Sequence, residues 1–256
     1  MSSDKVVRIS SRDNPLLKEL RKVSQDPAAY RVFGRVWLEG DHLCRAALQR
    51  GVQPAVAVFC ESCWPTAPAE WSQGAEKIVV MPDALFRGLS ALESPARMGF
   101  VVEFRPQELA PGVPTVVLDR VQDAGNVGSI LRSAAAFGFR QVVAVKGTAG
   151  LWSPKVLRAG MGAHFGLRLV EGADLADLMR LAVPLVATSS HQGVPLRQLK
   201  LPKTCAWVFG HEGQGVSEPL MGLAETLAQI EQPGGEESLN VAAAAAICLH
   251  ASAVSA

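Results

Sequence analysis

The sequence predicts an α/β protein in two parts, with a mostly parallel sheet in the C-terminal part and a smaller α/β domain before it. Beyond residue 114, short β-rich runs alternate with helical patterns, which is typical of parallel sheets covered by helices on both faces. Glycine-rich loops at 210–215 and 234–235 follow two predicted strands, and open α/β sheets bind ligands at such places. Residues 105–114 hold three prolines and one glycine, which indicates a domain boundary. The expected division is a domain at 1–105, a linker at 106–114 and a domain at 115–256.

Length and composition agree with a globular protein of this kind. The 256 residues suffice for one large or two modest domains with buried cores, and 48% of them are apolar against 19% charged. No apolar run is long enough to span a membrane, and the N-terminus lacks the apolar core of a signal peptide. We therefore expect a cytoplasmic protein with no membrane partner.

The net charge of +1 does not by itself indicate a polyanionic partner. Residues 1–50 nevertheless contain ten lysines and arginines against six acidic residues. Such a basic N-terminal face could contact phosphates, although a solvated helix face is the simpler interpretation when it is taken alone. The basic residues that cluster there are Lys5, Arg8, Arg12, Lys18, Arg21, Lys22, Arg31 and Arg35.

Five cysteines, an odd number, argue against a disulfide framework. Cys60 and Cys63 have the spacing of half a zinc site or of a redox pair, but no second Cys or His pair at metal spacing accompanies them. We therefore expect no metal site. We also expect small buried core residues at Cys44, Cys205 and Cys248.

The elements of the N-terminal part follow from caps and apolar patterns. Asn14 before Pro15 is a typical helix start, and a second helix is expected from a cap at Asp41 to a stop at Gly51. The apolar stripe of the first helix comprises Leu16, Leu17, Leu20 and Val23. Strands are expected over 36–40, 55–59, 77–80 and 98–104, a third helix over 82–89, and an irregular or short helical segment over 64–71.

In the C-terminal part, strands and helices alternate. Short apolar runs predict the strands, and longer patterns with helical periodicity predict the helices. Strands are expected over 115–118, 141–145, 184–188, 205–209 and 226–230, and helices over 126–137, 154–161, 174–182 and 238–252, with a further short helix between the last two strands.

Several polar residues stand close to the starts of these helices. Asn126 lies near one helix start and Arg132 six residues later, and by themselves they are most simply a cap and a surface charge. Ser238 would likewise cap the last helix, with Glu237 and Asn240 in its first turn.

The loop at 210–215 carries one carboxylate, Glu212, beside His211. A single histidine in a loop is weak evidence for a catalytic base. The glycine spacing also resembles a nucleotide-binding loop, but no P-loop lysine follows it and no acidic ribose contact is placed as a dinucleotide site requires.

In order and spacing, three stretches resemble the motifs of the SpoU (TrmH-like) family of SPOUT RNA methyltransferases. They are Asp-Ala-Gly-Asn-Val-Gly-Ser-Ile-Leu-Arg-Ser at 123–133, Val-Phe-Gly-His-Glu-Gly-Gln-Gly-Val-Ser at 208–217, and Ile-Glu-Gln-Pro-Gly-Gly-Glu-Glu-Ser-Leu-Asn-Val at 230–241. The resemblance is strong over 115–250. In the N-terminal part it is weaker, and the features that look like the RNA substrate-binding domain of longer members are Asn14-Pro, the stretch 34–40 and the run that ends at Gly51.

The resemblance implies a trefoil knot in the C-terminal domain, with S-adenosylmethionine bound in the knot. It also implies a homodimer through that domain, with an active site shared across the interface. The catalytic set that it implies is Asn126, Arg132, Glu212, Ser238 and Asn240. The residues that it implies for cofactor binding are Thr188, Ser189, Gly210, Glu212, Ile230, Gly234, Ser238 and Leu239.

These residue types suit methyl transfer from a sulfonium to a ribose 2′-hydroxyl, which must be held in line and lose its proton. Arg132 would hold the adjacent phosphate and stabilise the developing alkoxide. Family proposals make this arginine the base, although a guanidinium is a poor one. Glu212 would fix Arg132 through a two-pronged ion pair, while Asn126 and Asn240 set the geometry. The 2′-hydroxyl also distinguishes RNA from DNA.

At two places the sequence departs from the family pattern. Glu231 stands where a proline is usual, with Pro233 two places later, and we expect this change to reshape one wall of the cofactor pocket. Gly160 stands where a serine is common, so we expect a hydroxyl contact to substrate or cofactor to be missing. The catalytic set is complete, which argues against an inactive homologue.

We therefore expect an S-adenosylmethionine-dependent RNA 2′-O-ribose methyltransferase that acts on ribosomal RNA, because the N-terminal part resembles those of rRNA-modifying members. Three alternatives stay open. They are a tRNA methyltransferase, a non-catalytic RNA-binding assembly factor that keeps the fold, and a nucleotide-dependent enzyme that uses Gly210–Gly215.

Overall fold

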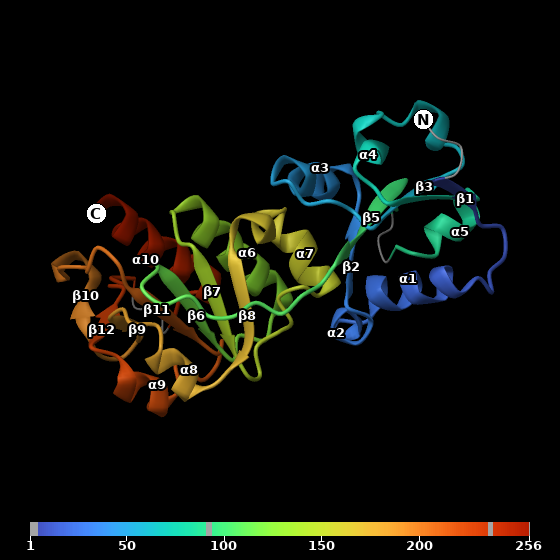
Figure 1. The fold of residues 1–256 in the computed structure, drawn as a ribbon. Coiled ribbons are helices and arrows are strands. Elements are labelled where there is room, and N and C mark those ends of the chain that lie inside the picture. Colours follow the sequence, from blue (N-terminus) through green and yellow to red (C-terminus); the bar gives the residue numbers. More distant parts are fainter. Residues whose placement is uncertain (1–4, 91–93, 235–237, 256) are drawn as a thin grey trace. The chain divides into compact units, whose positions relative to one another are not determined.

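The chain divides into two compact units in the computed structural model, which describes residues 5–90, 94–234 and 238–255 (Figure 1). Unit 1 joins Met1–Arg105 with Trp152–Phe165, and unit 2 joins Pro106–Leu151 with Gly166–Ala256. The segment Trp152–Phe165 lies inside the range 115–256 of the expected second domain, yet it packs in unit 1. Within the described ranges, no helix combines the length and the apolar character that crossing a membrane requires.

Unit 1 is built on a five-stranded mixed sheet with the strand order β1-β4-β3-β5-β2. β1, β4 and β3 run parallel, whereas β5 is antiparallel to both β3 and β2. The strands are β1 (Val6–Arg8), β2 (Arg35–Glu39), β3 (Val56–Cys60), β4 (Lys77–Met81) and β5 (Met98–Glu103). The helices are α1 (Pro15–Gln25), α2 (Ala29–Phe33), α3 (Asp41–Gln49), α4 (Glu70–Gln73), α5 (Asp83–Arg87) and α7 (Pro154–Gly160), with a 3-10 turn at Trp64–Thr66.

The helix starts in unit 1 test two of the predicted caps. Asn14 caps α1 as predicted, since its side chain accepts the N–H of Leu16. The prediction of a cap at Asp41 is wrong by one residue. Gly40 is the cap of α3, and its φ of 89° is a conformation that glycine adopts without strain.

The segment that joins unit 1 from the second half of the chain packs through Leu157, which is buried in the same cluster as Tyr30 and Phe100. The segment also explains the glycine at position 160. A Cβ on Gly160 would lie 2.5 Å from Cε1 of the buried His164 ring, so a serine does not fit there. The departure from the family pattern therefore has a packing cause within this segment.

Unit 2 is built on a seven-stranded sheet in which every pairing is parallel, which confirms the predicted sheet type. The strand order is β10-β12-β9-β11-β6-β7-β8. The strands are β6 (Thr115–Asp119), β7 (Gln141–Val145), β8 (Arg168–Ala173), β9 (Leu185–Thr188), β10 (Val194–Pro195), β11 (Ala206–Gly210) and β12 (Thr226–Gln229). The helices are α6 (Ala124–Ala136), α8 (Leu175–Met179), α9 (Glu218–Leu223) and α10 (Val241–Ser255), with a 3-10 turn at Leu196–Gln198. A further 3-10 turn at Ala163–Gly166 ends the segment that belongs to unit 1.

The central strands of unit 2 are buried over their whole length, as the apolar runs predict. The structure adds two edge strands that the sequence does not reveal, β8 and β10. β8 contains a glutamate and a glycine, and β10 has only two residues, so neither shows an apolar strand pattern. The trefoil knot implied by the resemblance stays a prediction.

Candidate active site

Four loops meet at one edge of the sheet in unit 2. β12, β9, β11 and β6 are neighbours in that order and run parallel, so their carboxyl ends lie side by side. The loops that follow them begin at residues 230, 189, 211 and 120. This arrangement brings the three polar stretches of the sequence, which are up to 114 residues apart, to the same place.

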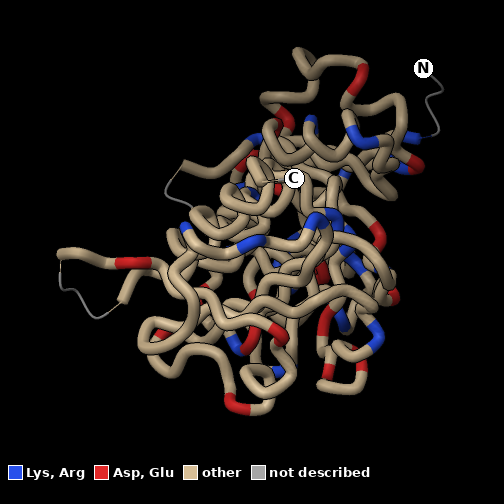
Figure 2. The backbone as a smooth tube through the Cα atoms, turned by 90° about the vertical axis from the view of Figure 1, so that its left-hand side faces the viewer, with Lys and Arg blue, Asp and Glu red and all other residues tan. Residues whose placement is uncertain are grey.

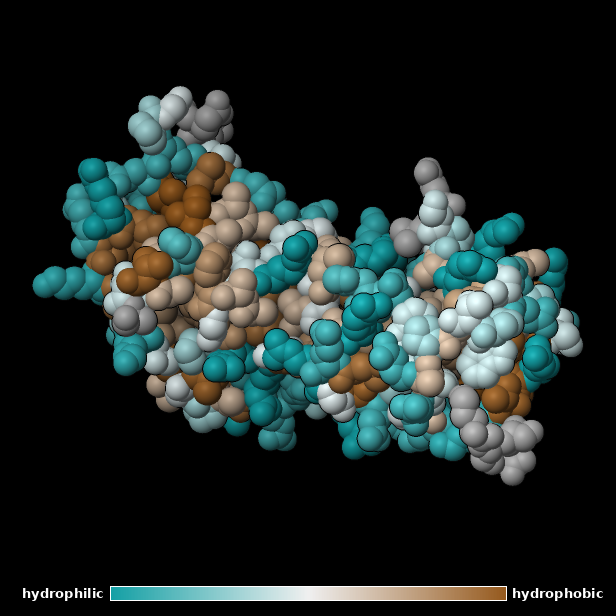
Figure 3. Space-filling view, turned by 90° about the horizontal axis from the view of Figure 1, so that it is seen from above, coloured by the Kyte–Doolittle hydropathy of each residue, from teal (hydrophilic) through white to brown (hydrophobic). Residues whose placement is uncertain are grey.

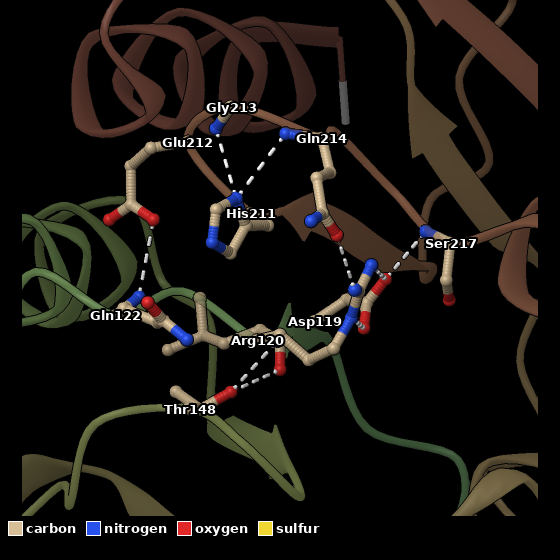
Figure 4. Close-up of polar contacts among 10 residues, drawn as sticks. Asp119, Arg120, Gln122, Thr148, His211, Glu212, Gly213, Gln214 and Ser217 are labelled. Atoms are coloured by element: carbon tan, nitrogen blue, oxygen red, sulfur yellow. Dashed lines mark hydrogen bonds and ion pairs between the residues drawn. The ribbon is translucent and has the colours of Figure 1, made fainter.

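Glu212, in the loop after β11, is fixed by the loop after β6. Its two carboxylate oxygens accept the backbone N–H groups of Gln122 at 3.2 Å and Asp123 at 3.0 Å, and one also accepts the side-chain amide of Asn126 at 3.2 Å (Figure 4 shows the Gln122 contact). Partial burial raises the pKa of Glu212, but these hydrogen bonds outweigh it, and the pKa lies below its ordinary value. The side chain is therefore a carboxylate that organises a helix start.

Asn126 and Asn240 continue this contact into the third stretch. Asn240 uses its Oδ1 to accept the N–H groups of Ala242 and Ala243 at the start of α10. Its amide nitrogen is therefore left to donate, and it donates to Oδ1 of Asn126 at 3.0 Å. Asn126 in turn donates to Glu212, so the orientation of both amides follows from one chain of hydrogen bonds.

Two expected features of the helix ends need correction. Asp123, not Asn126, caps α6, because its carboxylate accepts the N–H of Asn126 at 2.8 Å. Asn240, not Ser238, provides the capping oxygen of α10, which begins at Val241. Both asparagines of the catalytic set are thereby placed with their free amide groups toward neighbouring motifs.

The predicted ion pair between Glu212 and Arg132 is wrong within this chain. Arg132 is exposed, and no ion pair joins it to Glu212 in the part of the chain that the structure describes. The reason is helix geometry. Six residues along α6 turn a side chain by about 600°, so the directions of Arg132 and Asn126 differ by about 120° around the helix axis, and Arg132 does not face the same loop.

The loop after β11 folds back on itself at Gly210. A Cβ on Gly210 would lie 2.1 Å from the carbonyl carbon of Gly215, so only glycine permits this return. His211 and Gly215 exchange two backbone hydrogen bonds at 3.0 and 2.8 Å. Nδ1 of His211 accepts the N–H groups of Gly213 and Gln214, and this nitrogen is therefore engaged in the loop (Figure 4).

Two residues at the end of β6, Asp119 and Arg120, are part of the site although the sequence analysis gave them no role. The buried carboxylate of Asp119 accepts the N–H of Ser217 at 2.6 Å and Nε of Arg120 at 3.0 Å, and an Nη of Arg120 donates to Gln214 at 2.8 Å (Figure 4). The signal in the sequence was an Asp-Arg pair directly after an apolar strand, a position from which polar side chains reach the ligand-binding edge.

The loops after β9 and β12 are joined to each other. The hydroxyl of Thr188 donates to the carbonyl of Val208, and the N–H of Ser189 donates to the carbonyl of Ala228. Nε2 of Gln229 donates to the carbonyl of Ser190 at 3.0 Å. A salt bridge of 2.9 Å between Arg197 and Glu231, both largely exposed, shows that the glutamate in the usual proline position points outward.

The loop after β12 has the chemistry of a site for S-adenosylmethionine. Oε1 of Gln232 is buried and accepts no hydrogen bond from the residues that the structure describes. Leaving a buried acceptor without a donor costs about 1–3 kcal/mol, and the adenine, ribose and amino-acid parts of this cofactor all carry N–H or O–H donors. The residues present therefore fit the cofactor.

The remaining residues of the predicted site lie on this loop or beside it. Ile230 is half-buried, whereas Gly234, Ser238 and Leu239 are exposed. Gly235 and Glu237 lie outside the described residues. Among the described side chains, no group of three or more His, Cys, Asp or Glu residues could hold a metal ion.

Comparisons with known proteins agree with this geometry. Residues 114–250 match the model of the SpoU rRNA methylase family. The chain is 28% identical to the 23S rRNA (guanosine(2553)-2′-O)-methyltransferase RlmP of Bacillus subtilis, over 95% of this chain and 98% of that protein. It is 30% identical to an uncharacterized tRNA/rRNA methyltransferase of Synechocystis, over 98% of this chain and 94% of that protein. The crystal structure of an AdoMet-bound rRNA methyltransferase from Sinorhizobium meliloti is similar with a TM-score of 0.84, at 26% identity and 97% coverage of both chains.

Proposed function

This chain belongs to the SpoU rRNA methylase family, and from that premise we propose how its residues perform methyl transfer to ribosomal RNA. It is an S-adenosylmethionine-dependent RNA 2′-O-ribose methyltransferase. The observation that carries the assignment of residues is the hydrogen-bonded chain from Asn240 through Asn126 to Glu212, because it links all three motifs at one edge of the sheet.

The bound cofactor supplies an electrophilic methyl group on a sulfonium. The protein has to hold the ribose 2′-hydroxyl in line with that group and favour its deprotonation. Ionised Glu212 fixes Asn126, and Asn240 fixes it from the other side, so that Asn126 offers a rigid polar contact to the substrate. Arg132 holds the adjacent phosphate and stabilises the developing negative charge on the oxygen.

Arg132 points away from Asn126 of its own chain, and this supports a site completed by a second copy. We assign the contact to α10, whose 15 residues are almost all apolar or small. Only Ala245, Cys248 and Leu249 of this helix are buried in the chain, while Ile247 and Val254 are 42% and 68% exposed. In the space-filling view, apolar residues gather at the unit 2 end of the surface, at the left of Figure 3. A homodimer through unit 2 would bury such a surface.

Cofactor binding is assigned to the loops after β9, β11 and β12. Main-chain groups at Gly210, Ile230 and Leu239 would hold it, with Thr188 and Ser189 beside them and Oε1 of Gln232 accepting from one of its donors. The remaining members of the predicted set, Gly234 and Ser238, lie on the same loop as Gln232. This arrangement leaves Glu212 to organise α6 and not to contact the cofactor directly.

RNA binding is assigned to the N-terminal domain, residues 1–105. α1 turns its apolar side inward, with Leu17, Leu20 and Val23 buried, and its basic residues outward. Lys22 is exposed and makes no ion pair among the described residues, while Arg21 donates to the backbone of Arg12 and so groups two basic side chains. Figure 2 marks the lysines and arginines along the backbone. A basic face of this kind binds phosphates without reading sequence.

Methyl transfer from labelled S-adenosylmethionine to purified ribosomal and transfer RNA tests the substrate. Label transferred to ribosomal RNA would support the proposal. So would the absence of a 2′-O-methyl group from the ribosomal RNA of cells that lack the gene. Label in transfer RNA alone would replace it by the tRNA alternative. Cofactor binding with no transfer to either RNA would favour an assembly factor. Because ribosomal RNA is the proposed substrate, the proposed location is the cytoplasm.

A further inference from the structure

Arg120 follows β6 at the edge of the unit 2 sheet where the four loops meet, and its backbone conformation is unusual. Its φ is 58°, in the left-handed region that residues other than glycine rarely adopt. Residues held in such conformations persist where their surroundings enforce them, and they cluster at functional sites. An arginine at this position therefore needs a reason.

The surroundings of Arg120 accommodate its backbone and its stem. The N–H of Arg120 donates to Oγ1 of Thr148 at 3.1 Å, and that hydroxyl donates to the carbonyl of Leu118 at 2.9 Å. Gly147 leaves room for the stem, since a Cβ there would lie 3.2 Å from Cγ of Arg120. The turn at 147–148 thus holds Arg120 in its left-handed conformation.

The guanidinium of Arg120 joins the two loops that build the site. Nε donates to Asp119 at 3.0 Å and an Nη donates to Oε1 of Gln214 at 2.8 Å (Figure 4). The hydrogen bond with Asp119 raises the pKa of Arg120 above its ordinary value, so the group stays charged. The same carboxylate accepts the N–H of Ser217, and the loop 211–217 is therefore held at two points by the end of β6.

We propose that Arg120 is a positioning residue for methyl transfer, acting through Gln214. By holding Gln214, it keeps the loop 211–217 where Glu212 meets the N–H groups of Gln122 and Asp123. Glu212 then aligns Asn126. This inference rests on the proposed function, because the reaction is its readout.

The test is a double-mutant cycle on methyl transfer with Arg120→Gly and Gln214→Leu. Glycine relieves the left-handed backbone, which offsets part of the cost of leaving the buried Asp119 carboxylate without the guanidinium. The variant is therefore expected to stay folded, with a melting temperature close to that of the wild type. Each single substitution should lower kcat by about 10²-fold, because a misplaced loop of this kind costs that much. The double variant should lose no more than either single one, since both break the same contact.

A third variant, Arg120→Lys, distinguishes the effect of the positive charge from that of the simultaneous hydrogen bonds to Asp119 and Gln214. Lysine keeps the charge but presents one ammonium in place of a planar fork, so it cannot serve Asp119 and Gln214 together and should be nearly as slow as Arg120→Gly. Ala182→Gly is the matched backbone control. Ala182 also has a left-handed φ, 54°, and lies at the amino-terminal side of β9, away from the site. This control should keep wild-type kcat.

Full activity of Gln214→Leu beside inactive Arg120→Gly would overturn the proposal, as would additive losses in the double variant. If Arg120→Lys kept the wild-type kcat, the positive charge alone would suffice, and the proposed link between Asp119 and Gln214 would be contradicted. If kcat decreased in proportion to the melting temperature in every variant, Arg120 would be a structural residue and not a positioning residue. Absence of transfer by the wild-type protein would instead contradict the proposed function, so the two failures are distinguishable.

Discussion

The two glycine-rich loops at the active edge look alike in the sequence but differ in the structure. The loop after β11 satisfies its polar groups within the protein, because His211, Glu212 and Gln214 all contact neighbouring backbone or side chains. Among the residues that the structure describes, the loop after β12 leaves a buried oxygen of Gln232 without a donor, and no atom lies within 4 Å of a Cβ placed on Gly234. The lack of a side chain at Gly210 thus lets the first loop fold back on itself, whereas no described residue fills the space beside Gly234.

This difference shows that a glycine-rich loop does not by itself identify a ligand-binding backbone. The closed loop holds a carboxylate that positions other groups, and we assign direct cofactor contact mainly to the open one. The predictions below test this division of labour, beginning with the largest expected effect.

Replacing Asn126 by alanine should abolish measurable methyl transfer, with a loss of about 10²- to 10³-fold in kcat, because the contact held by the closed loop is removed. Arg132→Ala should do the same. Single-turnover rates with labelled cofactor measure the loss, while gel filtration and circular dichroism should show the fold and association state of the wild type. Arg140→Ala, at the amino end of β7, is a matched control and should retain activity. Wild-type turnover in the Asn126 or Arg132 variant would mean that the active site is misplaced.

Gly210→Ala should destabilise the protein by about 3 kcal/mol, since the new Cβ would overlap the backbone of Gly215 at 2.1 Å and backbone cannot move as a side chain tip can. Gly234→Ala in the open loop should change the free energy of unfolding by less than about 0.5 kcal/mol. Urea denaturation of both variants measures the contrast. Equal losses would remove the distinction between the two loops.

Gln232→Leu should weaken binding of S-adenosylmethionine about tenfold, because the cofactor loses an acceptor. The same change should slightly stabilise the free protein, since a buried oxygen without a donor is replaced by apolar atoms. Calorimetric titration and thermal unfolding without cofactor give the two values. Unchanged affinity in a stabilised variant would show that Gln232 does not reach the cofactor.

The smallest effect concerns Glu212 and pH. Its pKa is lowered in the folded protein, so its contribution to stability is present above the pKa of the unfolded chain and is lost as the pH falls through the folded value. Melting temperatures of the wild type and Glu212→Gln should therefore differ near neutral pH and converge in acid. If the difference in melting temperature between the wild type and Glu212→Gln persisted in acid, the stabilisation would come from the packing of the side chain and not from its charge.

Much of the fold follows from local sequence signals, and the failures have physical causes. The apolar runs at 115–119 and 206–210 identify central strands because both faces are buried there. β8 was missed because an edge strand needs no continuous apolar run. Helix starts at Asp41, Asn126 and Ser238 were misplaced because several consecutive residues could cap, and only the backbone conformation decides among them.

The site was less predictable than the strands. Asn126, Glu212 and Asn240 meet as the motifs imply, yet the ion pair predicted between Glu212 and Arg132 does not form within the chain, because the direction of Arg132 depends on its position around α6. The position of Asp119 and Arg120 directly after an apolar strand is a weak signal, but their side-chain partners were not predictable, since Ser217 and Gln214 lie more than 90 positions away. Long-range polar contacts leave no periodic pattern in a sequence.

The packing of Trp152–Phe165 into unit 1 has a consequence for dissecting this enzyme. Severing the chain at its proline-rich connection after Arg105 would not yield two self-sufficient fragments. The shorter piece would lack Leu157 from its core, and the longer piece would expose that side chain and the His164 ring to water. Construction of a chimera from this enzyme therefore has to carry an internal segment of the catalytic half together with the N-terminal half.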